Sequence, residues 1–395
     1  MDVQVPRVQD AQERPGTPEQ ETLWIHAVSV GETQAALPLI KALQQHYPHL
    51  TLVITTTTPT GSERVRAALG DTVFHVYAPY DLPGAVRRFL QRTHPRVAII
   101  METELWPNLI HGCRQHGIPV IVANARLSER SAAGYQRIAG LTRQTLQDIT
   151  MIAAQASADA QRFMALGADP AQVRVTGNIK FDITPAADLQ QQAAALRHTW
   201  GTYRAVWIAA STHQDEDEQV LAAFAAVKLA LPDTLLILVP RHPERFAKVA
   251  ALCREQGYNI ALRSEQTRCD ATTDIFIGDS MGELMLFYAA SDVAFVGGSL
   301  VAHGGHNLLE PAVLGVPVIT GPHTFNFADI SRLLLEGGAA RQVSHPPELA
   351  ETVIAYLKND APRRSTGEQG QRLVVQNRGA LVKLMAIIRE CLDEK

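Results

Sequence analysis

The sequence lacks several features that mark whole classes of protein. Only four cysteines occur among 395 residues, without the CxxC spacing of a zinc site or the density of a disulfide scaffold, so a reducing cytoplasm is the simpler setting. The formal net charge is -4, so no global basicity indicates nucleic acid as a partner. The first 22 residues are polar, with no apolar run typical of a signal peptide or spanning helix, and we expect a flexible tail there.

What is present is a strong alternation of apolar and amphipathic segments. Hydrophobic residues make up 46% of a chain long enough for two domains. From Leu23, short β-branched runs alternate with helical patterns over residues 33–46, 82–93, 105–116 and 128–147, which predicts one doubly wound parallel sheet. The predicted strands are LWIHAV, LTLVIT, VFHVYAP, RVAIIME, PVIVANA and ITMIAAQ.

A polar, Gln-rich stretch over residues 184–199 interrupts this rhythm and indicates a domain connection with an entry helix. A second series of strands follows: AVWIAAS, TLLILVP, NIALRS, DIFIGDS, DVAFVGGS and VPVITGP, with helices starting near Asp215, Glu244, Gly282, Asn307 and Asn326. We therefore predict an α/β fold of two Rossmann-like doubly wound domains facing a central cleft. The predicted boundaries are 1–22 for the tail, 23–183 and 184–362 for the domains, and 363–395 for a terminal helical segment.

Ligands of such sheets are expected at the carboxyl ends of the strands, and acidic residues follow two of them. In SVGE, Glu32 opens a helix and can deprotonate a hydroxyl, or it can simply complement the helix dipole, the commoner role of an isolated Gly-Glu. Glu102 and Glu104 of METELWPN follow another strand and should share an edge with Glu32. They can divide base and positioning roles, or belong to a solvated loop before a helix.

Two further segments of the first half offer polar contacts. Residues 55–65, TTTTPTGSERV, can receive a polyhydroxylated or phosphorylated acceptor, or they can be an N-capped helix start at Thr60 or Ser62. NARLSERS contributes Arg126 and Arg130, which suit an anionic head group and equally an ordinary surface.

The second half carries candidates for binding a phosphate. Arg241 of VPRHPER suits phosphate because its fork is bidentate, and Met281, Gly282 and Glu283 of GDSMGELM stand at a predicted helix start. The densest signal is GGHNLLEP, with Gly304, Gly305, His306, Asn307 and Glu310 in one short turn. Backbone N–H groups there can hold a phosphate while Glu310 accepts from ribose hydroxyls. His303 and His306 have no Cys or carboxylate partner at ligand spacing, so we predict no metal site.

Taken together, HAVSVGE, TTTTPTGSERV, YAPYDLP, METELWPN, NARLSERSAAGY, GNIKFD, VPRHPERF, GDSMGEL and GGHNLLEP resemble the bacterial Kdo transferase family, in order, from Trp24 onward. The resemblance implies the GT-B architecture and an inverting glycosyltransferase that needs no cofactor or metal. It implies CMP-Kdo (CMP-activated 3-deoxy-manno-octulosonic acid) as donor and a lipid A precursor as acceptor. The place of action it implies is the cytoplasmic face of the inner membrane in lipopolysaccharide synthesis.

The resemblance also implies roles for individual residues. The family's general base falls on Glu32, and its two transition-state-stabilising residues fall on Glu102 and on Lys180 of GNIKFD. The cytidylate-binding positions fall on Pro240, Arg241, Met281, Gly282, Glu283, Asn307, Leu308, Leu309 and Glu310. Most were already candidates on physical grounds, whereas Lys180 was not.

One departure from the family concerns the membrane. Most members begin with a hydrophobic anchor helix and a basic segment, where this chain has a polar stretch. Either the anchor was removed in this version or the chain binds the bilayer peripherally, and peripheral binding would need apolar and basic surface on the N-terminal domain. Two alternatives to Kdo transfer stay open at this stage. One is another GT-B enzyme that uses or epimerises a UDP-sugar, and the other is a non-catalytic, two-lobed nucleotide- or sugar-binding protein.

Overall fold

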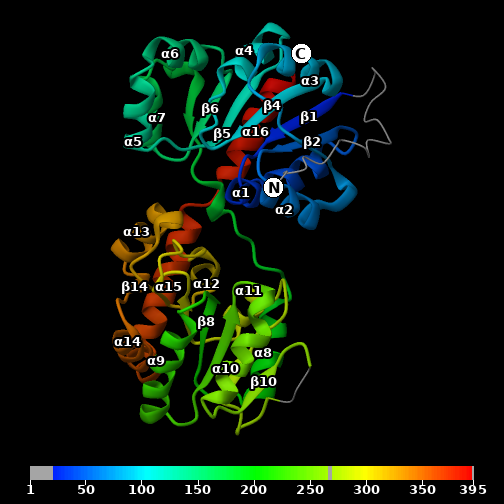
Figure 1. Cartoon of the computed structure of the whole chain (residues 1–395). Helices are drawn as coiled ribbons and strands as arrows, with labels where there is room; N and C mark the ends of the chain where they lie inside the picture. Colours follow the sequence, from blue (N-terminus) through cyan, green and yellow to red (C-terminus); the bar gives the residue numbers. More distant parts are fainter. Residues whose placement is uncertain (1–20, 266–268, 394–395) are drawn as a thin grey trace, which may run out of the picture. The chain divides into compact units, whose positions relative to one another are not determined.

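The computed structural model describes residues 21–265 and 269–393, and the chain divides into two compact units (Figure 1). The first unit holds the described residues up to Asp182 and those from Asn377 onward, and the second holds Ile183–Gln376. We predicted a flexible tail over residues 1–22. Residues 1–20 of this segment lie outside the described residues. No helix within the described ranges is both long enough and apolar enough to traverse a bilayer.

The first unit is built on a parallel sheet with helices on both faces. Its strands are β1 Thr22–His26, β2 Thr51–Thr56, β3 Phe74–Tyr77, β4 Pro95–Met101, β5 Val120–Ala125, β6 Met151–Ala154 and β7 Val173–Val175. Its helices are α1 Val30–His46, α2 Pro59–Leu69, α3 Pro83–Thr93, α4 Pro107–Gln115, α5 Glu129–Gln136, α6 Ala139–Gln147, α7 Ser157–Ala165 and α16 Ala380–Asp393, with 3₁₀ turns Gly70–Thr72, Pro170–Gln172 and Ile179–Phe181.

The strand order of this sheet decides where a ligand is expected. Within the described residues the order is β3-β2-β1-β4-β5-β6-β7, so the direction of winding reverses between β1 and β4. Connections leave this pair on opposite faces of the sheet, which opens a crevice outside the carboxyl ends of the two strands. Glu32 follows β1 and Glu102 follows β4, so both predicted acids stand at this switch point.

The second unit repeats the same architecture. Its strands are β8 Val206–Thr212, β9 Leu235–Pro240, β10 Ile260–Leu262, β11 Ile275–Ile277, β12 Val293–Val296, β13 Val318–Thr320 and β14 Ala340–Gln342. Its helices are α8 Leu189–Trp200, α9 Asp217–Ala230, α10 Phe246–Glu255, α11 Leu284–Ala289, α12 Leu309–Val313, α13 Ala328–Glu336, α14 Pro346–Lys358 and α15 Asp360–Gln376, with 3₁₀ turns Pro243–Arg245 and Phe325–Phe327.

The winding of the second sheet reverses between β8 and β12. For the described residues the order is β10-β11-β9-β8-β12-β13-β14, and in both sheets all neighbouring strands are parallel. The β8 and β12 strands are buried throughout, as expected where helices cover both faces. The predicted fold of two Rossmann-like parallel-sheet domains is therefore confirmed.

The last helix belongs to the first unit, although it ends the chain. Leu384, Ile387 and Ile388 of α16 are buried in the same apolar cluster as Leu39 and Ile40 of α1. Asp182 accepts from the backbone N–H groups of Gly379 and Leu381, both at 2.6 Å, which fixes the start of the helix. Figure 1 shows α16, in red, alongside the first sheet. The C-terminal segment thus completes the core of the first unit.

Some predicted elements were wrong in detail. The helix predicted over residues 128–147 is two helices, α5 and α6, because Gly134 and Gly140 flank the break and Thr142 Oγ1 donates to the Tyr135 carbonyl (3.0 Å). The strands β7 and β14 and the helix α14 were not predicted. Both strands have three residues, two of them exposed or polar, so neither presents an apolar run.

Candidate functional site

Glu32 lies in the first turn of α1, at the carboxyl end of β1. Ser29 caps the helix by accepting from the Glu32 N–H at 3.3 Å, and its hydroxyl donates to Glu32 Oε1 at 2.8 Å. The Val28 N–H donates to Glu32 Oε2 at 2.9 Å. This is a variant of the capping box, in which the carboxylate accepts from the residue before the N-cap, so Glu32 does serve the helix start. The same contacts fix its carboxylate in one orientation.

The surroundings of Glu32 also change its acidity. Only 9% of the residue is exposed. Burial raises the pKa of Glu32 to about 7; hydrogen bonds from Val28 and Ser29 oppose this rise, and the charges of Glu104 and Glu102 add to it. A carboxylate with a pKa close to neutrality exchanges protons readily at physiological pH. The helix-start role and a base role are therefore compatible at this residue.

Glu102 is joined to Lys180, which lies far away in sequence. The Lys180 Nζ atom is 3.0 Å from Glu102 Oε1, and both side chains are about three-quarters buried. Glu102 adopts φ of +57°, a left-handed conformation that is costly for a residue with a side chain. Strain of this kind is commonly stored at functional sites. The pair thus lies at the switch point, and Glu102, which supplies its carboxylate, has a strained backbone.

Asn124 fixes the turn that carries Lys180. Its Oδ1 accepts from the Ile179 N–H at 3.0 Å, and Asn178 Oδ1 accepts from the Lys180 N–H at 3.0 Å. Asn124 also has a positive φ, +53°, and among the described residues its buried Nδ2 has no hydrogen-bond partner. Sequence reasoning placed Asn124 only in a segment of interest. Its role in holding Lys180 comes from the structure.

Other first-unit candidates have structural duties. Thr58, rather than the predicted Thr60 or Ser62, caps α2 and accepts from the Gly61 N–H at 3.1 Å, because Pro59 suits the first helical position. Glu104 accepts from Trp106 Nε1 at 2.7 Å, which ties it to the start of α4. Arg130 is exposed on α5. Within the described part of the chain no hydrogen bond joins Thr58, Glu104 or Arg130 to Glu32, and Glu104 acts on Glu32 through its charge alone.

In the second unit, Pro240 ends β9 and Arg241 follows it. The Arg241 backbone N–H donates to the Thr212 carbonyl at 3.0 Å, whereas its side chain is exposed. Arg245 lies one turn further on and is an ion-pair partner of the buried Asp217. Arg241 is therefore held by its backbone and leaves its guanidinium available to a ligand.

The loop from Gly278 to Glu283 is held by an ion pair. Arg263 binds Glu283 through two parallel contacts, Nη2 to Oε1 at 2.6 Å and Nε to Oε2 at 2.9 Å. This pairing lowers the pKa of Glu283. The helix predicted to start at Gly282 starts at Leu284, because Gly282 has φ of +86°. Met281 is two-thirds exposed beside it.

The GGHNLLEP segment forms a tight turn before α12. Gly304 and Gly305 have φ of +90° and +74°, and a Cβ on Gly304 would collide with Asn326 and Phe325. Asn307 Oδ1 accepts from the Leu309 N–H (3.1 Å), and its Nδ2 donates to Glu310 Oε1 (3.3 Å). Burial raises the pKa of Glu310 to about 7. Leu308 and Leu309 are buried, so they offer backbone rather than side chain to a ligand.

Glu216 is a buried acid that sequence reasoning missed. Its carboxylate accepts from the N–H groups of Gly298 (2.6 Å), Ser299 (3.0 Å), Leu300 (2.9 Å) and His213 (3.2 Å). It therefore joins the ends of β8 and β12 across the switch point. Three histidines, His213, His242 and His303, were also passed over or weighed only as metal ligands. Within residues 21–265 and 269–393, no group of three or more His, Cys, Asp or Glu side chains is arranged to hold a metal ion.

Comparison with known proteins identifies the family. Residues 7–183 match the family model of the 3-deoxy-D-manno-octulosonic-acid transferases, and residues 208–373 match that of the glycosyl transferases group 1. A 3-deoxy-D-manno-octulosonic acid transferase of Haemophilus influenzae is 46% identical over 377 residues, which are 95% of this chain and 88% of that protein. The chain belongs to the Kdo transferase family. It is a glycosyltransferase, so the reading as a non-catalytic binding protein is set aside.

A second relative agrees with this placement, and a solved structure shares the fold. A family member from Bordetella pertussis is 37% identical over 94% of this chain and 87% of its own. The structure of UDP-GlcNAc 2-epimerase from Neisseria meningitidis matches 95% of this chain and 100% of its own with a TM-score of 0.61, at 13% identity. That likeness concerns the fold alone.

Proposed function

We propose that this Kdo transferase moves Kdo from CMP-Kdo to a lipid A precursor with inversion at the anomeric carbon, in the synthesis of the lipopolysaccharide inner core. The relatives named as 3-deoxy-D-manno-octulosonic acid transferases support the sugar that is transferred. The observation that carries the mechanism is the buried Glu32, whose pKa is raised to about 7 beside the acid of the Glu102–Lys180 pair.

The proposed reaction is a single displacement. The acceptor hydroxyl gives its proton to the Glu32 carboxylate while its oxygen bonds to the anomeric carbon of the sugar. The bond from that carbon to the phosphate oxygen breaks on the opposite face, and CMP leaves with the electron pair. A positioned base of this kind typically contributes about a hundred- to ten-thousandfold in rate.

Charge on the reacting groups is proposed to be balanced by protein side chains. Lys180, held by Glu102, stabilises the negative charge that develops in the transition state, and Arg241 binds the cytidylate phosphate. Glu310 accepts from the ribose hydroxyls, and the loop of Met281, Gly282 and Glu283 contacts the nucleotide. With these cations in place, we propose that the reaction needs no divalent metal or other cofactor.

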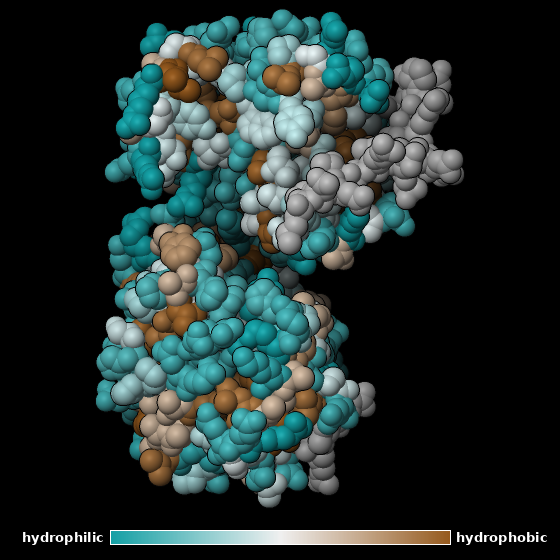
Figure 2. Space-filling model, viewed as in Figure 1, coloured by the Kyte–Doolittle hydropathy of each residue, from teal (hydrophilic) through white to brown (hydrophobic). Residues whose placement is uncertain are grey.

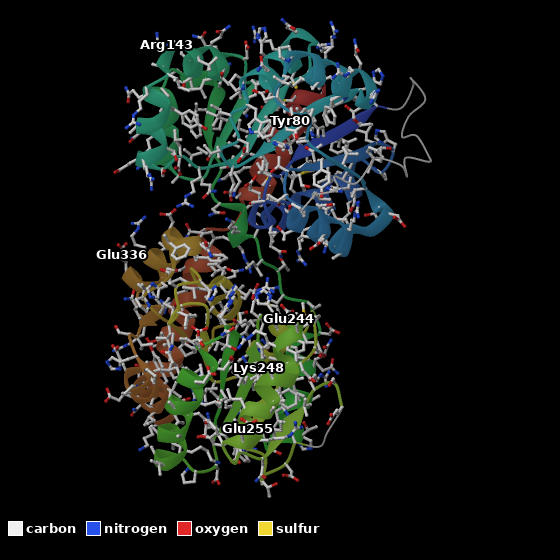
Figure 3. The ribbon with its side chains drawn as sticks, in the orientation of Figure 1. Tyr80, Arg143, Glu244, Lys248, Glu255 and Glu336 are labelled. Atoms are coloured by element: carbon white, nitrogen blue, oxygen red, sulfur yellow. The ribbon has the colours of Figure 1, made fainter. Side chains whose placement is uncertain are left out.

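The enzyme is proposed to work at the cytoplasmic face of the inner membrane as a peripheral protein. The supporting feature is the α5–α6 patch, which we define as Ile138 and Leu141 with Arg130, Arg137 and Arg143, all exposed. Figure 2 shows a hydrophobic area over α6, and Arg143 of the same helix is labelled in Figure 3. Apolar and basic side chains together favour binding to anionic lipid surfaces.

The attachment is tested by sedimentation with vesicles containing anionic lipid. Ile138→Asp should reduce the bound fraction severalfold, whereas Leu229→Asp, at a more exposed apolar residue of the second unit, should leave it unchanged. Equal binding of both variants and the parent to the vesicles would show that the α5–α6 patch does not attach the protein to the membrane.

The chemical function is tested by product mass. Purified protein, CMP-Kdo and a tetraacylated lipid A precursor should yield a lipid heavier by whole Kdo residues. CMP should inhibit this transfer and UDP should not. Turnover of a UDP-sugar in place of CMP-Kdo would support the rival GT-B activity instead.

A further inference from the structure

Four histidines of the second unit gather at the carboxyl ends of neighbouring strands. His213 follows β8, His242 follows β9, and His303 and His306 lie between β12 and α12. The His213 ring lies 4.1 Å from that of His303, 5.1 Å from that of His306 and 5.4 Å from that of His242 (ring centroids). We call these four residues the histidine cluster. It occupies the β8/β12 switch point, where the fold predicts a ligand.

The orientation of the rings shows how their nitrogens are used. His213 and His306 have ring planes within 4° of each other and Nε2 atoms 2.8 Å apart, so they share one hydrogen bond edge to edge. His213 and His303 stack face to face, with planes within 15°. Stacked rings do not point their nitrogens at one common centre, as ligands of a metal ion must.

The cluster carries uncompensated positive potential. Arg241 and Arg245 are the cations that act on His213, and Arg241 acts also on His306. The nearby acids are already engaged: Glu216 accepts from four backbone N–H groups, and Asp217 accepts from Thr212 Oγ1 and is paired with Arg245. Glu310 accepts from Asn307. Arg245 is paired with Asp217, and His242 lies 4.0 Å from Glu244. Among the described residues, no ion pair joins an acid to the other four groups, His213, His303, His306 and Arg241.

This arrangement suppresses protonation of the rings. Burial and then the neighbouring His and Arg side chains lower the pKa of His213 to about 4, and burial followed by Arg241 and the other three histidines lowers the pKa of His306 to about 3. Each neighbour acts in the same direction, as like charges do. An anion placed among the rings would oppose the effect of the neighbouring cations and favour uptake of a proton.

The backbone around the cluster is also held in costly conformations. Ser211 and Asp215, on either side of His213, have φ of +59° and +65°, and Gly298, against which the His213 and His306 rings lie, has φ of +66°. Non-glycine residues in this region cost on the order of 1–3 kcal/mol each and cluster at ligand sites. These backbone conformations are a second observation that points to a ligand near His213, and they do not depend on charge.

We propose that the histidine cluster, with Arg241, is an oxyanion subsite that binds an anionic group of the donor and takes up a proton when it does so. The identity of that ligand rests on the proposed function, because CMP-Kdo carries two such groups, the phosphate of the nucleotide and the carboxylate of the sugar acid. Neither His213, His242 nor His303 has a role in the scheme above. Each of these histidine rings can donate an N–H hydrogen bond to an oxygen atom of such an anionic group.

Sulfate is the first probe, because its charge stays constant between pH 6 and pH 8. Titrated into the whole protein in the presence of EDTA and followed by the ring signals of the histidines in NMR spectra, it should shift the signals of His213 and His303. Its affinity should be at least about tenfold higher at pH 6 than at pH 8, since proton uptake favours the lower pH. Equal affinity at both values, or no shift of these signals, would overturn the proposal.

Two variants separate the cluster from general charge effects. His303→Gln, at an exposed ring, should lose most of the pH dependence of sulfate binding, whereas His198→Gln, at an exposed position on α8, should keep it. If both bind sulfate as the parent does, the cluster is not the site.

Competition then identifies the source of the anion. Displacement of sulfate by CMP but not by cytidine assigns the cluster to the phosphate, and displacement by free Kdo assigns it to the carboxylate. Displacement by neither contradicts the assignment to the donor. If sulfate binding is as expected while CMP-Kdo supports no transfer, the proposed function fails and the oxyanion site stands.

Discussion

Lys180 Nζ lies 3.0 Å from Glu102 Oε1, although 78 residues separate the two in sequence. Glu102 directly follows β4, which ends at Met101. The chain after β7 runs back along the carboxyl ends of the strands, and this brings Lys180 to Glu102. Asn124, at the end of β5, anchors that returning segment through Ile179. The ammonium group is thus positioned by residues at the ends of two strands, β4 and β5.

Lys180→Ala should lower the rate of transfer with little effect on stability. The loss of one charge-stabilising donor typically costs about a hundred- to a thousandfold in kcat. A partly exposed ion pair contributes only about 0–1 kcal/mol to folding. Lys228→Ala is the matched control, since its Nζ is 2.8 Å from Asp274 Oδ1 at similar exposure in the second unit. A kcat within a few-fold of the parent for Lys180→Ala would remove Lys180 from the mechanism.

The pH dependence of transfer should report Glu32. A general base must be deprotonated, and burial raises the pKa of this carboxyl to about 7. The value of kcat/KM for the lipid acceptor should therefore rise about tenfold per pH unit below pH 7 and level off above it. Initial rates between pH 5 and pH 9 test this. A profile already flat at pH 5.5 would indicate a base with an ordinary carboxyl pKa.

Glu32→Gln should stabilise the fold at alkaline pH. The folded pKa of Glu32, about 7, lies above its ordinary value of 4.5, so its contribution to stability is greatest below pH 4.5 and is lost as pH rises through 7. At pH 8 the buried charge opposes folding by up to about 3 kcal/mol, and glutamine also serves in a capping box. Denaturant unfolding at pH 8 should show a gain that vanishes near pH 4.5. A loss exceeding about 1 kcal/mol at pH 8 would contradict this.

Arg263→Ala should weaken nucleotide binding without changing the chemistry. The two contacts from Arg263 hold the Glu283 carboxylate and, through it, the loop of Met281 and Gly282. We expect the inhibition constant of CMP to rise about tenfold, roughly the effect of one charge-assisted hydrogen bond, with kcat nearly unchanged. Arg332→Ala, on the surface of α13, is the control. Unchanged inhibition by CMP in Arg263→Ala would show that the loop held by Arg263 does not contribute to nucleotide binding.

The sequence was a good guide to the sheets because their strands are buried on both faces. Strands such as β4 Pro95–Met101 and β8 Val206–Thr212 are nearly continuous apolar runs, which are typical of buried strands. The position of Glu32 and Glu102 on one edge followed from this and is confirmed by the pairing of β1 with β4. The edge strands β7 and β14 gave no such signal, because two of the three residues in each are exposed.

The parts of the site that physical reasoning on the sequence did not find depend on contacts distant in sequence. Lys180 was assigned from the family resemblance alone, because nothing near it in GNIKFD indicates an active lysine, and its partner Glu102 became visible only in the folded chain. Glu216 was not predicted as a site residue, and its carboxylate accepts from a loop 82 to 84 residues away. The histidine cluster draws on three loops in the same way. Spacing rules that look for ligands within one motif do not detect such groups.

The central claim is that Glu32 is the base of a Kdo transferase, and a single-turnover rate tests it most directly. Enzyme in excess over CMP-Kdo, with the lipid acceptor saturating at pH 8, should transfer Kdo at least a hundredfold more slowly in Glu32→Gln than in the parent. CMP binding and unfolding must be measured on the same preparations to show that the variant is intact. Transfer by a folded, CMP-binding Glu32→Gln enzyme at close to the parental rate would contradict the account.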